Sequence, residues 1–142
     1  ANHYYYAWEP VTPPASPDLS DAGAPTVKVK GATTSGVTLT ETTVAEGATG
    51  SSATATGFVD GSADKIDFTI TPSTNVTLVS ATLKADSSAV STFNKDATTG
   101  VDVGSVAGTV NYELTVVVKG DGTNLSSTEK TYTYKLALTV EA

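Results

Sequence analysis

The sequence has no cysteine, no methionine and no arginine, because lysine accounts for all eight of its basic residues. The absence of cysteine excludes disulfides, thiolate metal sites and cysteine nucleophiles. The one histidine is His3, close to the start of the chain, so a Ser-His-Asp centre would have to be built from that end. Paired carboxylates can hydrolyse glycosides, but the acids here are scattered over turns and strand faces. We therefore do not expect an enzyme.

The charge excludes further classes of protein. The formal net charge is -7. Phosphate recognition depends on clusters of basic residues and works best with the planar arginine side chain. An acidic chain without arginine is therefore not expected to bind nucleic acid or an anionic membrane. No stretch approaches the ~20 apolar residues of a membrane helix, so we expect no membrane insertion of the mature chain.

What is present favours strands. The chain has 142 residues, a size typical of one domain. Its apolar residues are mostly Val, Ala and Leu among many Thr, Ser and Gly, and β-branched side chains suit a pleated surface. Apolar and polar residues alternate most clearly over 131–140, 110–118 and 65–71. Over 131–140 the face expected to be buried carries Tyr132, Tyr134, Leu136, Leu138 and Val140.

Seven to nine short strands are predicted in total, with polar turns that contain glycine and with no helical period. The loop 120–129 should join the two clearest strands as a long hairpin. Further strands are expected at 26–30, 37–44, 52–59, 76–84, 89–93 and 101–106. This pattern predicts an all-β fold, an antiparallel β-sandwich of immunoglobulin-like or jelly-roll type with an extended N-terminal tail.

Composition divides the chain into three regions. Residues 1–9 form an aromatic N-terminal tail, residues 10–25 hold five of the six prolines, and residues 26–142 read as the β-sandwich domain. Proline fixes the backbone in extended conformations, so the middle region is predicted to be a semi-rigid spacer of up to about 3.1 Å per residue.

The tail is the strongest indication of function. It holds four of the ten aromatic residues of the chain. In an extended strand, Tyr4, Tyr6 and Trp8 share one face and Tyr5 lies on the other. Large rings bury about 150–250 Å² each, so three of them contribute several kcal/mol at about 25 cal/mol per Å². We expect Tyr4, Tyr5, Tyr6 and Trp8 to dock into another subunit; the alternatives are a tail folded onto its own domain or a disordered end.

Several features favour an extracellular location. The first residue is the small Ala1, as expected after removal of a secretory signal peptide. Two glycosylation sequons, at Asn75 and Asn124, lie beside turn-like sequence. We therefore predict secretion to the cell surface, with glycans at Asn75 and Asn124, although a chain this rich in Ser and Thr also contains sequons by chance.

Two metal sites can be derived from residue types. Asp60 and Asp64 place carboxylates in a short loop that contains glycine, which suits Ca²⁺, but Asp and Gly are also ordinary turn residues. A free amino terminus followed by His3 at the third position can hold Cu²⁺ or Ni²⁺ in square-planar nitrogen geometry. Neither pattern is specific, and no other cofactor is expected.

The organisation of the chain resembles that of extracellular filament subunits assembled by donor-strand complementation. These include chaperone–usher pilins and the thread-like filaments of archaea. The resemblance lies in the processed-looking N-terminus, the extended tail at 1–9 and the Thr/Ser/Val-rich β domain, without a diagnostic motif. It implies a structural subunit whose tail inserts as a strand into the next copy in a head-to-tail homopolymer. The alternative is a secreted carbohydrate-binding or adhesive module in which the tail aromatics stack on sugars.

Overall fold

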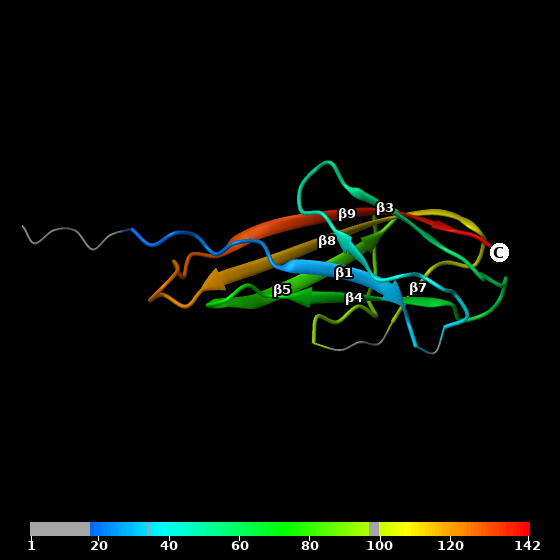
Figure 1. Cartoon of the computed structure of the whole chain (residues 1–142), viewed down its shortest axis with the longest axis horizontal. Helices are drawn as coiled ribbons and strands as arrows, with labels where there is room; N and C mark the ends of the chain where they lie inside the picture. The colour runs from blue at the N-terminus through cyan, green and yellow to red at the C-terminus, as the bar shows by residue number, and fades with distance from the viewer. Residues whose placement is uncertain (1–17, 34, 97–99) are drawn as a thin grey trace, which may run out of the picture.

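The computed structural model describes residues 18–33, 35–96 and 100–142, and these residues contain strands but no helix (Figure 1). No segment of the described chain is therefore a helix long and apolar enough to cross a membrane. The strands form two sheets that enclose one apolar core. The predicted all-β sandwich is confirmed.

The smaller sheet has four strands in the order β2-β1-β4-β7. All of its neighbours are antiparallel, and β1 pairs with β4 along its whole length. The bounds are β1 Thr26–Gly31, β2 Thr42–Val44, β4 Lys65–Thr71 and β7 Val101–Asp102.

The larger sheet has five strands in the order β3-β9-β8-β5-β6. The hairpin of β8 and β9 is its longest feature and is antiparallel, as the sequence predicts. The outer strand β3 instead runs parallel to β9, so the sandwich is mostly rather than entirely antiparallel. The chain reaches β3 from β2 in the other sheet, and such a crossing does not impose the direction that a hairpin would. The bounds are β3 Ser51–Ala55, β5 Val76–Ala85, β6 Ser88–Ala89, β8 Gly108–Gly120 and β9 Lys130–Val140.

The strands predicted at 26–30, 65–71, 76–84, 110–118 and 131–140 are confirmed, and the other predicted strands are shorter than expected. The segment 37–44 contributes only Thr42–Val44, and 52–59 contributes Ser51–Ala55. The second of these stops before Gly57, whose φ of 84° turns the backbone out of the strand. The two segments predicted over 89–93 and 101–106 reduce to two-residue pairings at β6 and β7.

The core lies between the sheets and is built from alternate residues of each strand. Tyr134, Leu136, Leu138 and Val140 of β9 are buried, as the period of two predicts. The rings of Phe68 in the smaller sheet and Tyr112 in the larger sheet meet edge to face, with centroids 5.5 Å apart. This contact joins the two sheets across the core.

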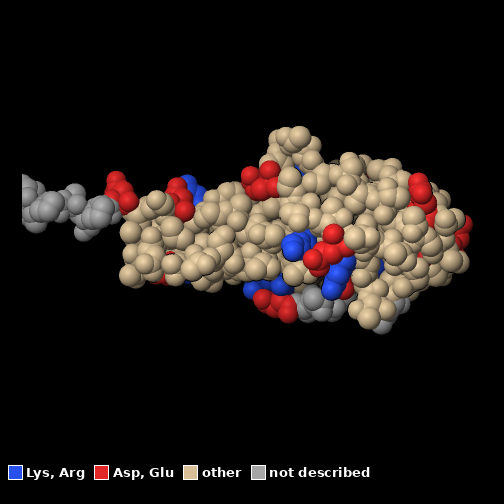
Figure 2. Space-filling view, viewed as in Figure 1, with Lys and Arg blue, Asp and Glu red and all other residues tan. Residues whose placement is uncertain are grey.

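The surface carries charges of both signs in small groups. Figure 2 shows acidic and basic side chains side by side on the visible face, with broad uncharged areas between them. Exposed pairs such as Lys28–Glu41, at 3.5 Å, contribute at most about 1 kcal/mol. The fold is therefore stabilised mainly by its core.

Candidate functional site

Residues 18–25, here called the strap, run along the inner face of the β8–β9 hairpin before β1 begins. The hydroxyl of Tyr132 donates a hydrogen bond to the carbonyl of Ala22 at 2.5 Å, and the hydroxyl of Tyr134 donates one to the carbonyl of Pro25. Ala22 is 0% exposed and Pro25 is also buried. Two tyrosines of the last strand thus fasten the segment that precedes the first strand.

The strap is fastened to the tip of the hairpin as well. The N–H of Ser126 donates to the carbonyl of Ser20 at 2.8 Å, and the Lys130 ammonium lies 3.1 Å from an oxygen of Asp21. The described chain therefore starts at the pole formed by this tip, whereas the C-terminus lies at the opposite pole (Figure 1).

Burial changes the acidity of the Tyr134 hydroxyl, one of the two groups that hold the strap. It raises the pKa of Tyr134 to about 12, with smaller contributions from the charges of Glu46 and Tyr132. The hydroxyl therefore stays protonated and keeps donating to Pro25 well above neutral pH.

The predicted docking residues Tyr4, Tyr5, Tyr6 and Trp8, together with His3, lie outside the described residues. Their docking role and the copper or nickel site remain predictions. Part of the predicted spacer is described, and residues 18–25 of it pack on the domain as the strap. The rest of the predicted spacer, 10–17, lies outside the described residues.

The predicted calcium ligand Asp64 is 3% exposed and joins two loops, the connection between β1 and β2 and its own connection between β3 and β4. Its Oδ1 accepts a hydrogen bond from the N–H of Gly36 at 3.1 Å. Its Oδ2 accepts one from the N–H of Val59 at 3.1 Å and one from the Ser62 hydroxyl at 2.7 Å. These bonds, that of Ser62 first, lower the pKa of Asp64. Its carboxylate oxygens already have hydrogen-bond donors.

The second predicted ligand, Asp60, is exposed in the same connection between β3 and β4. In the described part of the chain, no three His, Cys, Asp or Glu side chains are grouped so that they could hold a metal ion. Calcium at Asp60 and Asp64 stays a prediction, which isothermal titration with Ca²⁺ would test.

Both sequons lie at the hairpin pole. Asn75 is exposed in the turn before β5, with a φ of 64°, and Asn124 is exposed in the loop between β8 and β9. Asp121 organises that loop: its Oδ1 accepts the N–H groups of Thr123, Asn124 and Leu125, and its Oδ2 accepts the Asn124 side-chain amide at 2.7 Å. The two candidate glycan acceptors thus differ in the state of the side-chain amide, because that of Asn124 already donates a hydrogen bond to Asp121.

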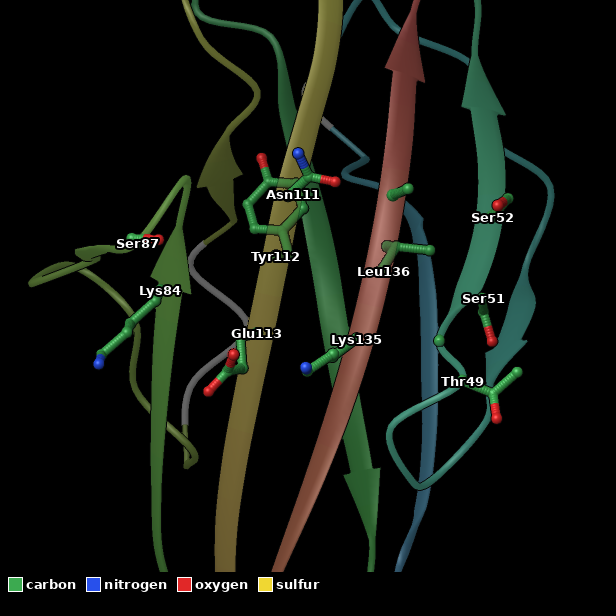
Figure 3. A pocket seen from close by; sticks show the side chains of 12 residues that line it. Thr49, Ser51, Ser52, Lys84, Ser87, Asn111, Tyr112, Glu113, Lys135 and Leu136 are labelled. Atoms are coloured by element: carbon green, nitrogen blue, oxygen red, sulfur yellow. The ribbon is translucent and has the colours of Figure 1, made fainter.

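A polar hollow of about 450 Å³ lies on the outer face of the larger sheet (Figure 3). Strand register places Lys84, Glu113 and Lys135 directly opposite one another on β5, β8 and β9. Figure 3 shows Glu113 between the two lysines, with Asn111 and Ser52 further along the same face. The hollow can offer hydrogen bonds and two positive charges to a polar ligand. It offers no aromatic stacking face, because Tyr112 is 2% exposed and its hydroxyl donates to the Asp102 carbonyl at 3.2 Å.

Comparison with known proteins gave no match to any protein-family model, curated protein or solved structure. The function is therefore argued from the geometry of the chain. Sequence reasoning missed the row of Lys84, Glu113 and Lys135, because cross-strand register is not visible in a single strand. It placed Tyr132 and Tyr134 on the buried face, where the structure has them, but it did not predict that their hydroxyls fasten the strap.

Proposed function

We propose that this protein is a structural subunit of an extracellular, pilus-like filament, and that its tail inserts as a strand into the neighbouring subunit. The observation that carries the proposal is the strap. Through Tyr132 and Tyr134 it anchors the start of the described chain, residue 18, at the pole opposite the C-terminus, and seventeen residues precede it in the sequence. A contact made by one end of a molecule with a different surface of the next copy produces an open chain of subunits.

The reach of the tail supports contact with a neighbour. Seventeen residues in extended, proline-rich conformation span roughly 50 Å at about 3.1 Å per residue. The 13 residues of β8, which run most of the length of the sandwich, span roughly 40 Å at about 3.3 Å per residue. Residues 1–17, when extended, are therefore long enough to reach along a second domain.

The proposal is tested by deleting residues 1–9 and examining the protein by electron microscopy. The full chain is expected to form filaments, and the deletion variant is expected to remain a folded monomer. Tyr6→Ser should impair assembly more than Tyr5→Ser, because Tyr6 belongs to the predicted ring face with Tyr4 and Trp8. Filaments that persist unchanged after the deletion would refute the proposal.

A second candidate function, a secreted sugar-binding or adhesive module, is favoured by the polar hollow at Lys84, Glu113 and Lys135. In this candidate the tail aromatics supply the stacking face that the hollow lacks. Glycan-array binding by the monomer, lost in Trp8→Ala, would support it over the filament. A monomer that binds no sugar would count against it.

A further inference from the structure

Strand β5 has a free edge. It pairs with β8 along its length but with β6 only at Lys84 and Ala85. Beyond that, the carbonyl of Leu83 accepts the N–H of Val90 at 2.9 Å. In the described part of the chain, no strand pairs with Val76–Leu83 on this side. Because successive residues of a strand point their backbone groups to opposite sides, Ala81 presents its N–H and C=O to the same side as Leu83.

This edge lacks the usual protection against pairing. Exposed edge strands normally carry charges or proline that prevent association with another chain. Residues 76–83 read VTLVSATL and contain neither. The one interruption is the bulge between Leu78 and Ser80. The other outer strands offer less length or less apolar surface for pairing with another chain. β2, β6 and β7 have two or three residues each, and β3 consists of small Ser, Ala and Thr residues.

Partly buried apolar side chains of β5 and of the preceding strand β4 lie at the margin of the core, here called the seam. Ile70 of β4 and Leu78 and Ala81 of β5 pack against the core but are only partly buried. Beside them, a hollow of about 360 Å³ lies between Val79–Ala81 and the segment 91–96, with Phe93 in its lining. An extended strand laid on the edge would place alternate side chains over this apolar seam.

We infer that the free edge of β5 and the adjoining seam accept residues 1–9 of a second copy of the chain. This inference rests on the proposed function and names the surface that receives the tail. The backbone of the tail would pair with the free N–H and C=O of Ala81. The rings on one face of the tail would cover Ile70 and Leu78; these rings are Tyr4, Tyr6 and Trp8. Its nine residues are enough to span the eight residues of the free stretch Val76–Leu83.

Disulfide trapping tests the inference, and the absence of native cysteine makes every cross-link interpretable. Ala81→Cys is combined in the full-length chain with a cysteine at position 4, 6 or 8, in three separate variants. The matched control carries the same tail cysteines with Ala53→Cys, because Ala53 is also partly buried but lies on β3, the opposite edge of the sheet. A disulfide needs Cα atoms about 4.4–6.8 Å apart, so it reports direct pairing.

The expected result is a ladder of disulfide-linked multimers with Ala81→Cys and only background with Ala53→Cys. Cross-linked monomers would overturn the inference, since the tail would then fold onto its own domain. Filaments that cross-link only through Ala53→Cys would overturn it while leaving the proposed function intact. Filaments that form equally well without residues 1–9 would overturn both.

A charge substitution gives an independent readout. Ala81→Asp should abolish filament formation, whereas Ala53→Asp should leave it unchanged, with thermal unfolding used to confirm that each variant is folded. Folded Ala81→Asp that assembles like wild type would contradict the inference. If Ala81→Asp does not fold, the cross-linking result decides.

Discussion

The hydroxyl of Tyr134 on the last strand donates a hydrogen bond to the backbone carbonyl of Pro25, directly before the first strand. The two residues are 109 positions apart in the chain. With the bond from Tyr132 to Ala22, which is fully buried, this contact holds the strap on the domain. It also fixes the pole at which the described chain starts.

Removing these hydroxyls should loosen the strap. Tyr134→Phe and Tyr132→Phe are each expected to lower the free energy of unfolding by about 0.5–1.5 kcal/mol, because each leaves a carbonyl without its donor. Urea denaturation measures the change. Since Phe keeps the ring in the core, unchanged stability in both variants would show that the hydroxyls do not hold the strap.

Alkaline pH should destabilise the domain. Burial raises the pKa of Tyr134 to about 12 and that of Tyr112 still higher, against 10.0 for an ordinary tyrosine. As pH rises above 10, the unfolded chain loses these protons first, so stability falls between pH 10 and 12. Denaturation at a series of pH values should show this fall, and it should be smaller in Tyr134→Phe. An identical pH dependence in that variant would contradict the assignment.

Asp64 should matter more to stability than its neighbour Asp60. Asp64→Ala removes the acceptor shared by Gly36, Val59 and Ser62, whereas Asp60 is exposed. The melting temperature should therefore drop in Asp64→Ala and change little in Asp60→Ala. Because the pKa of Asp64 lies below the ordinary 3.8, its stabilising contribution is present above that pH and is lost as pH falls through the folded value. Equal melting temperatures would argue against this role.

The close approach of two loops should make Gly57 irreplaceable. A Cβ at Gly57 would lie 2.9 Å from the carbonyl oxygen of Gly36, and its φ is +84°. Gly61 has a similar φ of +78° but nothing within 4 Å. Gly61→Ala should lower the free energy of unfolding by about 1–2 kcal/mol through backbone strain alone, and Gly57→Ala should lower it further because of the added steric contact. Chemical denaturation of both variants measures the two losses. Equal losses would show that the contact between Cβ and the Gly36 carbonyl has no effect.

In a host that glycosylates the folded chain, Asn75 should be modified more fully than Asn124. The Asn124 amide donates to Asp121 at 2.7 Å, and Asp121 also holds the loop backbone. Asp121→Ala should raise occupancy at Asn124 and leave Asn75 unchanged, as measured by mass spectrometry of glycopeptides. Higher occupancy at Asn124 in the unmodified chain would contradict this order.

Much of the fold could be predicted, because a strand with one buried face alternates apolar and polar residues along the sequence. This signal located β4, β5, β8 and β9 and the buried side chains of β9. It failed where strands are short: β6 and β7 have two residues each, too few for alternation to be visible. The parallel direction of β3 was also missed, since pairing direction depends on how the chain crosses between sheets.

The sequence by itself determined the class of fold, the long hairpin and the concentration of rings in residues 1–9. Those features depend on neighbours in the chain. Only the tertiary structure decided that tyrosines of β9 fasten the strap, that Asp64 joins two loops, and that β5 keeps a free edge over a partly buried seam. Each of these features depends on how segments far apart in the sequence are aligned. Such contacts form, and stabilise the fold, only when the two sheets pack together.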